Sequence, residues 1–488
     1  MNDTITKVNG FAKGEYPDLL INLKPQEESD YQVKYTDVAM GIESPAIKAG
    51  GILVSLWINV ASIPCSVFSE EGLKAEDEAG ALPLEISDET DEYGFPIRRW
   101  KPCRDTVGTV AVNYRFYPRV VPPDYKFRPY YDFRNEHLGA TGSGVSSLVV
   151  PENKKYHIHI EWDLSEMPAD ATAVSVKGEG SYDYVGIPED YQFTMYAVGK
   201  VKCHATAGGR FKVYWLNEPL PDKERILDSI PKILQGMCDF FRDEDTYYRV
   251  FFRKDPFKMS NGATAFENGF IYGYSDEKPL NRDMALDIFS HEVVHTWPHI
   301  EDTHGEGTWY HEGTAEMYSI KIPYRLGITD LDDVARVLGY RGQSYYCNKY
   351  KNKPCTEVFP LYWSERDAQS LPYGRGFFYF IDTDAKIRKA SGGKRSVDDL
   401  VLEIEMRRRS GKNVTCADWE ELIEKELGPE AVTDFREIMN GKLIEPSEDW
   451  FDGAFTISKG TVTDPVRNRV ETDAYIWTRR PDRDKADI

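Results

Sequence analysis

The first part of the chain carries short apolar runs of the kind that form β-strands. In segments 51–60, 109–117 and 156–162, apolar and polar residues alternate, or β-branched and aromatic residues are enriched. Clusters of Pro, Gly and Asp separate these runs, as turns separate strands. Short strands at this spacing predict an N-terminal domain of β-sandwich type over residues 1–205. Its acidic stretch, 70–92, is expected to form a solvated loop or an irregular hairpin.

The pattern changes near residue 220, where apolar residues begin to recur at helical spacing. Residues 223–242 carry them three or four positions apart, which predicts an amphipathic helix. The aromatic run 247–253 predicts a strand, and the glycine-bearing segment 261–274 predicts an edge strand. Because helix and strands follow one another here, we expect an α/β subdomain over residues 206–325.

The rest of the chain is mostly helical in pattern. The stretch 371–390 has an apolar face, basic residues in its last turn and a glycine pair beyond it, which together mark the end of a helix. Further helices are expected at about 397–408 and 417–440. These segments predict a helical subdomain over residues 326–450, followed by an irregular tail over 451–488.

The predicted fold class is therefore α+β with several domains. A chain of 488 residues with 41% hydrophobic content can bury more than one core. Lys and Arg total 60 while Asp and Glu total 81, and the resulting net charge of −21 opposes binding to nucleic acid.

The chain also lacks the sequence signals of membrane insertion and secretion. No apolar run approaches the ~20 residues that cross a bilayer, and the first residues are not a basic start followed by an apolar stretch. The seven cysteines form no CxxC pair and fit free thiols. We expect a cytoplasmic protein that binds neither nucleic acid nor membrane, with its oligomeric state open.

Candidate chemistry is concentrated in one short region, since five of the nine histidines lie between residues 291 and 311. His291 and His295 form an HExxH motif. Four residues apart on a helix, they project from one face and can hold one Zn²⁺ ion. Glu292 reaches the same side, where it can take a proton from water bound to the metal.

A catalytic zinc needs a third protein ligand, and the segment Trp309-Tyr-His-Glu-Gly-Thr-Ala-Glu offers one. Glu312 and Glu316 would face the same way on a second helix. We assign Glu312 as the third ligand and Glu316 as the carboxylate that orients a ligand histidine; the opposite assignment is the alternative. Three further histidines compete for the third position: His299, His304 and His311.

These motifs resemble the gluzincin peptidases, specifically their aminopeptidase branch, which reads HExxHxW followed by WxxEGxA. Leu371-Pro-Tyr-Gly-Arg-Gly-Phe-Phe is similar to the tyrosine motif of that branch. The run from Asp384 to Leu400 and the upstream strings VNYRFY, EWDL and GEG resemble the glycyl aminopeptidase family in particular. The resemblance spans most of residues 30–445. It implies a thermolysin-like zinc catalytic domain behind the β domain, with one Zn²⁺ per chain.

The resemblance also implies roles for residues outside the metal motif. Tyr373 matches the tyrosine whose hydroxyl stabilises the oxyanion of the tetrahedral intermediate; the alternative is a tyrosine of the helix core. Thr264-Ala-Phe-Glu-Asn-Gly is similar to the segment Gly-Ala-Met-Glu-Asn of aminopeptidases. Glu267 would then bind the free amino group of the substrate, and Gly262 would lie along the substrate backbone. A solvated loop glutamate is the alternative for Glu267.

The function we expect is that of a zinc-dependent metallopeptidase that removes amino-terminal residues from peptides. An alternative keeps the zinc and changes the substrate, since one fold hosts many chemistries: a hydrolase or biosynthetic enzyme acting on a non-peptide small molecule. A third possibility is a non-catalytic binding protein that keeps the fold. It is disfavoured because both histidines, Glu292, Glu312 and Tyr373 are all present.

Overall fold

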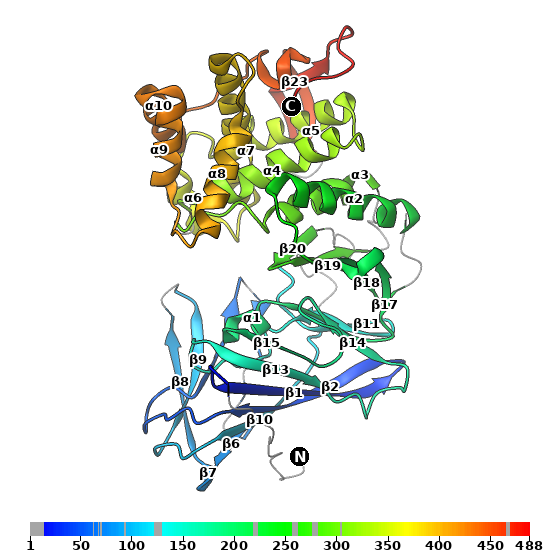
Figure 1. Ribbon diagram of the computed structural model, residues 1–488, viewed down its shortest axis with the longest axis vertical. Helices are drawn as coiled ribbons and strands as arrows, with labels where there is room; N and C mark the ends of the chain where they lie inside the picture. Colours follow the sequence, from blue (N-terminus) through cyan, green and yellow to red (C-terminus); the bar gives the residue numbers. More distant parts are fainter. Residues whose placement is uncertain are drawn as a thin grey trace. The chain divides into compact units, whose positions relative to one another are not determined.

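The computed structural model describes residues 14–61, 63–66, 68, 71–91, 94–121, 129–217, 223–255, 262–275, 282–302, 305–464 and 469–488. The chain forms two compact units, each built from two stretches of sequence (Figure 1). The first unit takes 1–223 and 247–281, and the second takes 224–246 and 282–488. Packing between distant segments defines these two units, whereas the domains expected from the sequence are continuous ranges. The expected domain boundaries stay predictions.

The largest sheet of the first unit has seven strands, with the amino-terminal strand near its middle (Figure 1). Two expected strands, in 109–117 and 156–162, are confirmed as β10 and β13. In order across the sheet the strands are β15 (Tyr182–Gly186), β13 (Tyr156–Trp162), β1 (Asp18–Ser29), β2 (Gln32–Ile42), β10 (Val110–Phe116), β6 (Leu73–Asp77) and β7 (Gly80–Leu82).

A second sheet of the first unit shares one hydrophobic core with the first. Ile21, Met40 and Ile158 of the seven-stranded sheet and Ala140 and Val198 of the smaller sheet belong to the same buried cluster. Two sheets with a common core are what a sandwich requires. The smaller sheet consists, in order, of β11 (Arg134–Glu136), β12 (Gly139–Ser143), β16 (Met195–Gly199) and β14 (Thr172–Ser175), and the short helix α1 (Pro188–Gln192) precedes β16.

The acidic stretch 70–92 was expected to be a solvated loop or an irregular hairpin. Its described residues form strands β6, β7 and β8 (Leu84–Thr90), and β6 and β7 pair antiparallel, so the hairpin alternative is nearer to the structure than the loop. Acidic residues of β8 meet basic residues of the neighbouring strand β9 (Pro96–Pro102), as in the Arg98–Asp88 and Arg99–Glu89 ion pairs of 2.7 and 2.6 Å. These cross-strand pairs could not be seen in the composition of the stretch alone. β3 (Val54–Trp57) completes this three-stranded sheet, and β4 (Asn59–Val60) pairs with β5 (Ile63–Pro64).

The five-stranded sheet of the first unit is mixed. β18, β19 and β21 are parallel, whereas β17 and β20 run antiparallel at its two edges. The expected strand at 247–253 is β19, and the expected edge strand within 261–274 is β20. The strand order is β17 (Lys202–Ala205), β18 (Phe211–Trp215), β19 (Tyr248–Lys254), β21 (Gly269–Tyr274) and β20 (Gly262–Phe266).

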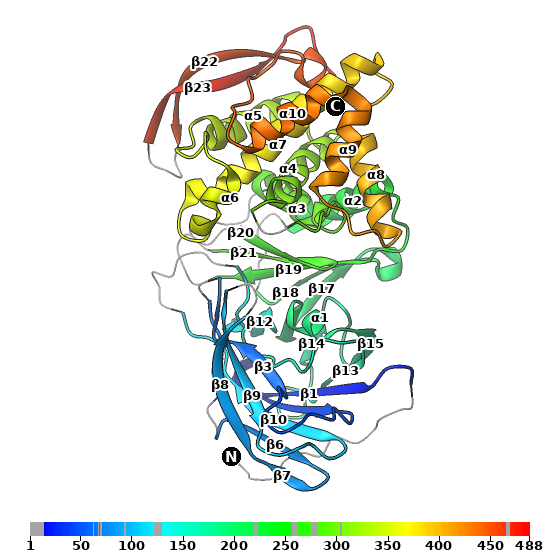
Figure 2. The same ribbon diagram turned by 90° about the vertical axis from the view of Figure 1, so that its left-hand side faces the viewer.

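The second unit is built mainly of helices (Figure 2). The predicted helices at 223–242, 371–390 and 397–408 are confirmed as α2, α7 and α8, and Gly392 ends α7 in the left-handed conformation (φ 63°). The helices are α2 (Lys223–Phe241), α3 (Arg282–Val294), α4 (Thr308–Arg325), α5 (Leu331–Tyr346), α6 (Cys355–Val358), α7 (Arg366–Ser391), α8 (Val397–Arg409), α9 (Cys416–Leu427) and α10 (Pro429–Met439). The segment 417–440 is two helices rather than one, because Gly428 (φ 89°) breaks it before Pro429.

The tail expected to be irregular over 451–488 instead carries a two-stranded hairpin of β22 (Phe455–Asp464) and β23 (Arg469–Arg479) (Figure 2). Trp477 of β23 stacks on Phe378 of α7 with ring centroids 5.9 Å apart, and Tyr475 contacts Tyr346 of α5. Tertiary packing of these aromatic side chains holds the hairpin against the helices. The short alternation of residue types in the two strands does not by itself predict this packing, so the hairpin was not expected from the sequence.

Two findings concern the expectations about thiols and membranes. None of the seven cysteines forms a disulfide in the described part of the chain. Within the described ranges, no helix is both long enough and apolar enough for a membrane crossing.

Candidate metal centre

The two histidines of the HExxH motif lie at the carboxyl end of α3. His291 is in the last turn of the helix, and His295 follows its last residue, Val294. The turn is closed by the Thr296 amide, which donates to the Val293 carbonyl at 3.1 Å, and by the Trp297 amide, which donates to the Val294 carbonyl at 3.0 Å. The chain therefore keeps a helical turn for one residue beyond α3, enough to hold both imidazoles on one side.

Trp297 anchors this turn. Its ring is fully buried and stacks on Phe241 of α2 with centroids 4.9 Å apart and an interplanar angle of 13°. Its indole nitrogen donates to Asp243 at 2.8 Å. The tryptophan after the second histidine is thus a packing and hydrogen-bonding residue that fixes where His295 stands.

Glu312, near the start of α4, completes a triangle of donor atoms with the two histidines. His291 Nε2 lies 3.2 Å from His295 Nε2, 3.3 Å from Glu312 Oε2, and His295 Nε2 lies 3.6 Å from Glu312 Oε2. Tetrahedral zinc binds such atoms at about 2.0–2.2 Å, which places its ligands about 3.3–3.5 Å from one another. The three residues form a group able to hold a metal ion, and their donor spacing fits Zn²⁺.

The charge states of these groups suit a cation. Glu312 Oε2 is buried and has no hydrogen-bond partner among the described residues. Burial alone would raise the pKa of the Glu312 carboxyl, but the His291 and His295 imidazoles outweigh it and keep that pKa below its usual value. Burial lowers the pKa of His295 to about 4 against the opposing effect of Glu312, so its ring is neutral at pH 7 and offers a lone pair.

Glu316 contacts the opposite nitrogen of His291. Its Oε1 lies 3.1 Å from His291 Nδ1, and its Oε2 is paired with Arg341 of α5. Arg341 in turn reaches Asp287 of α3 at 3.3 Å. A carboxylate next to Nδ1 keeps the proton of His291 on that nitrogen and leaves the lone pair on Nε2. Glu312 therefore belongs to the donor triangle at Nε2, whereas Glu316 lies on the other side of the His291 ring, at Nδ1.

Glu292 is half-buried next to the triangle. Burial raises the pKa of its carboxyl to about 7, with a further contribution from Glu312 and an opposing one from His291. A carboxyl group that titrates near neutral pH is suited to taking up and releasing a proton.

Tyr373 of α7 lies over the ring of His291. The two rings are stacked with centroids 5.7 Å apart and an interplanar angle of 6°. The Tyr373 hydroxyl accepts from the hydroxyl of Tyr362 at 3.4 Å, and burial raises the pKa of Tyr373 well above its usual value. Tyr373 thus stays protonated, with its ring against that of His291, and its role toward a substrate stays a prediction.

The competing histidines make other contacts. His311 Nε2 is within hydrogen-bond distance of the Ile300 amide and carbonyl, at 3.2 and 3.0 Å, and its ring stacks on His299. His299 is largely exposed and lies 3.6 Å from Glu301. Neither belongs to a candidate metal group in the described part of the chain. His304 lies outside the described residues.

The expected substrate-binding residues lie on the five-stranded sheet of the first unit. Gly262 begins the edge strand β20, so its backbone is on the side of the sheet that has no further strand among the described residues. Glu267 stands in the turn between β20 and β21, largely exposed, with its carboxylate 2.8 Å from the Lys177 ammonium. Their roles toward a substrate stay predictions.

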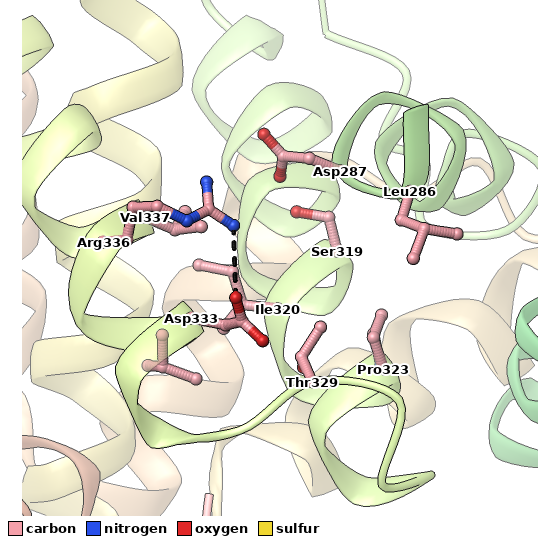
Figure 3. Close-up of a pocket in the computed structure, with 10 residues that line it drawn as sticks. Leu286, Asp287, Ser319, Ile320, Pro323, Thr329, Asp333, Arg336 and Val337 are labelled. Carbon is pink, nitrogen blue, oxygen red and sulfur yellow. Dashed lines mark hydrogen bonds and ion pairs between the residues drawn. The ribbon is translucent and has the colours of Figure 1, made fainter. Parts of the chain in front are cut away.

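A separate pocket of the second unit lies among α3, α4 and α5 (Figure 3). Leu286 and Asp287 of α3, Ser319 of α4 and Val334 of α5 line it, with Thr329 from the connecting loop. The donor atoms of the metal group do not line this pocket. Its Asp287 nevertheless contacts Arg341, which pairs with Glu316, so this packed interface supports the orientation of His291.

Sequence reasoning missed Arg341 and Tyr362. Arg341 is a nearly buried arginine in a helix whose other inward residues are mostly apolar, and this contrast was the available signal. Tyr362 lies in an irregular, aromatic segment with no motif, and only the structure brings its hydroxyl to Tyr373.

Comparison with known proteins gives a likeness in structure rather than in sequence. No protein-family model and no curated protein sequence matches the chain. An aminopeptidase N family protein from Idiomarina loihiensis is similar in structure, with a TM-score of 0.69 and 15% identity over 92% of this chain and 80% of that one.

Two other solved structures have the same fold. A mutant M1 zinc metallopeptidase from Deinococcus radiodurans, bound to a Tyr-Ser-Ala substrate, has a TM-score of 0.53 and 14% identity over 88% of this chain and 94% of that one. Leukotriene A4 hydrolase from Saccharomyces cerevisiae has a TM-score of 0.54 and 14% identity over 88% and 68%. The chain therefore has the mixed α/β, multi-sheet fold of these proteins. The resemblance to the gluzincin peptidases is confirmed at the level of fold, while the glycyl aminopeptidase branch stays a prediction.

Proposed function

We propose that the chain is a zinc metallohydrolase, and specifically a peptidase that cleaves residues from peptide amino termini. The observation that carries the proposal is the triangle of His291 Nε2, His295 Nε2 and Glu312 Oε2, with separations of 3.2–3.6 Å. Shared fold with zinc metallopeptidases, one of them bound to a tripeptide, supports the same class of reaction.

His291, His295 and Glu312 are the residues that would hold the ion. When bound, Zn²⁺ supplies Lewis-acid chemistry, in which a carbonyl is polarised and the pKa of water is lowered to about 7. Glu316 holds the proton of His291 on Nδ1 and so keeps Nε2 available to the ion. Arg341 holds Glu316 in place from the other side.

The remaining roles belong to Glu292 and Tyr373. The Glu292 carboxylate removes a proton from the attacking water and later returns it to the leaving amine, for which a pKa near neutral pH is suited. Tyr373 donates its hydroxyl hydrogen to the oxygen on which negative charge develops. The Tyr362 hydroxyl lies 3.4 Å from the Tyr373 oxygen and can donate to it, which would leave the Tyr373 hydrogen for this contact.

The amino-terminal preference rests on the segment that contains Glu267 and Gly262. An edge strand such as β20 can pair with an extended peptide backbone, and a carboxylate can bind an ammonium group. In the structure the Glu267 carboxylate is paired with Lys177. An incoming ammonium group would have to replace that partner.

This pairing favours a second candidate, a hydrolase or biosynthetic enzyme for a non-peptide small molecule on the same zinc site. Such a substrate needs no anchor for an amino group, and leukotriene A4 hydrolase shares the fold. Glu267→Gln separates the two. In an aminopeptidase, the substitution should lower kcat/KM on free aminoacyl substrates while the zinc content stays the same. In an enzyme with a different substrate, kcat/KM on that substrate should stay the same.

A panel of fluorogenic aminoacyl and amino-blocked peptide substrates tests the proposal. We expect hydrolysis of the free aminoacyl compounds, its loss on chelation and its return with Zn²⁺. Zinc content is measured in parallel by elemental analysis, in wild type and in Glu312→Ala. A protein that binds zinc through this site but cleaves no member of the panel would lead us to the small-molecule candidate. A protein whose zinc content is unchanged by Glu312→Ala would refute the metal centre.

A further inference from the structure

A second cluster of possible metal ligands lies on the large sheet of the first unit. His157 and His159 are two residues apart on β13, so both project from the same face of the strand. The residues that alternate with them, Tyr156, Ile158 and Ile160, are buried in the sandwich core. The histidines therefore occupy the outer face of the sheet.

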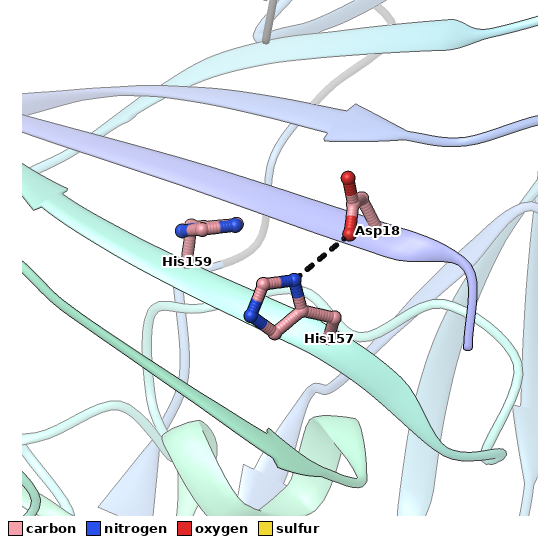
Figure 4. A group of neighbouring side chains, drawn as sticks. All are labelled: Asp18, His157 and His159. Carbon is pink, nitrogen blue, oxygen red and sulfur yellow. Dashed lines mark hydrogen bonds and ion pairs between the residues drawn. The ribbon is translucent and has the colours of Figure 1, made fainter. Parts of the chain in front are cut away.

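Neighbouring strands add a carboxylate on each side. In the parallel pairing with β1, Asp18 stands opposite His157, and in the antiparallel pairing with β15, Asp183 stands opposite His159. Paired residues share a face of a sheet, so strand register alone brings the two imidazoles and two carboxylates together. Donor atoms of Asp18, His157 and His159 lie within 4.8 Å of one another (Figure 4).

Asp18 determines which nitrogen of His157 is available. Its Oδ1 lies 3.0 Å from His157 Nδ1, and its side chain is completely buried (Figure 4). An ionised carboxylate only accepts hydrogen bonds, so the proton of a neutral His157 is held on Nδ1 and the lone pair is on Nε2. Carboxylates hold metal-binding histidines in this way.

The free nitrogen of His157 and the ring of His159 converge on Asp183. Asp183 Oδ1 lies 4.0 Å from His157 Nε2 and 3.5 Å from His159 Nδ1, and the two rings have centroids 4.4 Å apart. The 4.0 Å separation is too long for a direct hydrogen bond and the 3.5 Å one is at the limit. The 3.5 Å separation matches the 3.2–3.6 Å between donor atoms in the candidate metal centre of the second unit, whereas the 4.0 Å one would have to shorten by a few tenths of an ångström around an ion.

From this arrangement we propose a second metal site, in which His157 Nε2, His159 Nδ1 and Asp183 bind a divalent transition-metal ion and Asp18 orients His157. Two imidazoles and a carboxylate suit Zn²⁺ and Cu²⁺ better than Mg²⁺ or Ca²⁺. Asp183 and both histidines are partly exposed, on or next to the edge strand β15, so an ion reaches them from solvent. The ion links β15 and β13 directly, and Asp18 extends the link to β1.

The site has a structural role, because the ion joins β13 to β15 while Asp18 of β1, 139 positions away from His157 in sequence, holds that histidine in place. An ion bound only in the folded state raises the stability of that state, and the gain grows with the logarithm of the ion concentration once that concentration exceeds the dissociation constant. This inference does not depend on the proposed enzymatic function, since none of its residues belongs to the metal centre of the second unit.

Metal stoichiometry of the full chain tests the proposal. Chelator-stripped protein is dialysed against micromolar Zn²⁺ and analysed for zinc in four forms: wild type, His157→Gln/His159→Gln, His291→Gln/His295→Gln, and the combination of all four substitutions. We expect His291→Gln/His295→Gln to retain one equivalent and the fourfold variant to lose it. His137→Gln/His204→Gln, which changes two histidines outside both groups, is the matched control and should bind as wild type does.

Measurements in the wild-type background keep the test decisive if the His291→Gln/His295→Gln protein fails to fold. There, His157→Gln/His159→Gln should bind one equivalent less than the control variant. Its melting temperature should rise less with added Zn²⁺ than that of the control, because only the metal centre of the second unit remains. Asp183→Asn should weaken binding at this site at least tenfold. Where His291→Gln/His295→Gln folds, Cu²⁺ bound to it should show nitrogen couplings in its electron paramagnetic resonance spectrum. Equal zinc content in His157→Gln/His159→Gln and the control, or no zinc in folded His291→Gln/His295→Gln, would overturn the proposal.

Discussion

Gly313 of α4 and Gly376 of α7 meet backbone to backbone. A Cβ atom at Gly376 would stand 2.0 Å from the Trp309 carbonyl oxygen and 2.8 Å from Gly313 Cα, and one at Gly313 would stand 2.6 Å from the Gly376 backbone. The two helices can approach this closely only because both residues lack side chains. The contact lies next to Glu312 on one helix and one turn from Tyr373 on the other, so it brings both toward His291.

We predict that Gly376→Ala destabilises the protein and separates Tyr373 from the metal cluster. The new methyl group meets backbone atoms that cannot rotate away, and overpacking of this kind costs about 1–3 kcal/mol. Urea unfolding measures the loss, and kcat on the best substrate should fall with it. Gly339→Ala is the control, because nothing lies within 4 Å of a Cβ there and alanine favours a helix. Equal stability of the two variants would show that α4 and α7 do not need the close contact.

Glu292→Gln should keep its zinc and lose hydrolysis by several orders of magnitude. The amide is nearly the same size as the carboxylate but cannot accept the proton of the attacking water. Zinc content and kcat are measured on the same preparation. Glu301→Gln is a suitable control, since Glu301 is about half exposed and contacts His299 rather than the donor triangle. Substantial turnover by Glu292→Gln would remove the general-base role.

Tyr373→Phe should lower kcat by about 10²–10³, or about 2.7–4 kcal/mol of transition-state stabilisation, with little change in KM. The ring that stacks on His291 is retained, so only the hydroxyl is tested. Tyr379→Phe on the same helix removes a hydroxyl that contacts Trp419 and should leave kcat unchanged. A wild-type rate for Tyr373→Phe would make Tyr373 a core residue.

Arg341→Gln should weaken zinc binding by about 10–100-fold. This is the usual effect of removing a residue that orients a metal ligand through hydrogen bonds or ion pairs. Without the guanidinium, Glu316 loses its partner behind His291 and the imidazole is less firmly oriented. Competition with a zinc chelator measures the affinity. Arg336→Gln changes an exposed residue of the same helix that pairs with Asp333, and this variant should bind zinc normally. Identical affinities in both variants would exclude a role for Arg341 in the centre.

Asp398→Asn should destabilise the protein at pH 7 by about 3–5 kcal/mol, because it removes the nearer carboxylate partner of the buried Lys321, at 2.9 Å, and leaves Asp384 at 3.6 Å. Burial would raise the pKa of Asp398, but Lys321 and Arg325 outweigh it and hold the pKa well below its usual value. The lowered pKa stabilises the fold above the unfolded-state pKa of about 4, and this contribution is lost as pH falls toward the folded-state value.

The difference in unfolding free energy between wild type and Asp398→Asn should therefore shrink between pH 7 and pH 3. Urea unfolding at both pH values measures it. Glu403→Gln, which changes an exposed carboxylate on the same helix, should have little effect at either pH. A difference that does not depend on pH would show that Asp398 acts through packing and not through its charge.

Much of the fold could be predicted because local pattern is enough for long elements. The apolar spacing of α2, α7 and α8 and the alternation in β10 and β13 are properties of the segments themselves. The elements predicted wrongly are those whose pairing lies elsewhere in the chain. The β8 strand depends on basic residues of β9, and the β22–β23 hairpin depends on aromatic residues of α5 and α7.

The sequence by itself determined that the two imidazoles lie together, since the spacing of His291 and His295 on a helical turn places both on one side whatever surrounds them. It favoured Glu312 as the third ligand but left the opposite assignment open, because Glu312 and Glu316 share a helix face. Only the tertiary structure decided that Glu312 faces both Nε2 atoms while Glu316 lies behind His291 against Arg341. It also decided that Tyr373 reaches the cluster and that two distant strands bring Asp18 and Asp183 to His157 and His159. The physical reason is that helix periodicity is local, whereas the approach of α4 to α7 and the register of β1 and β15 on β13 depend on packing across long stretches of chain.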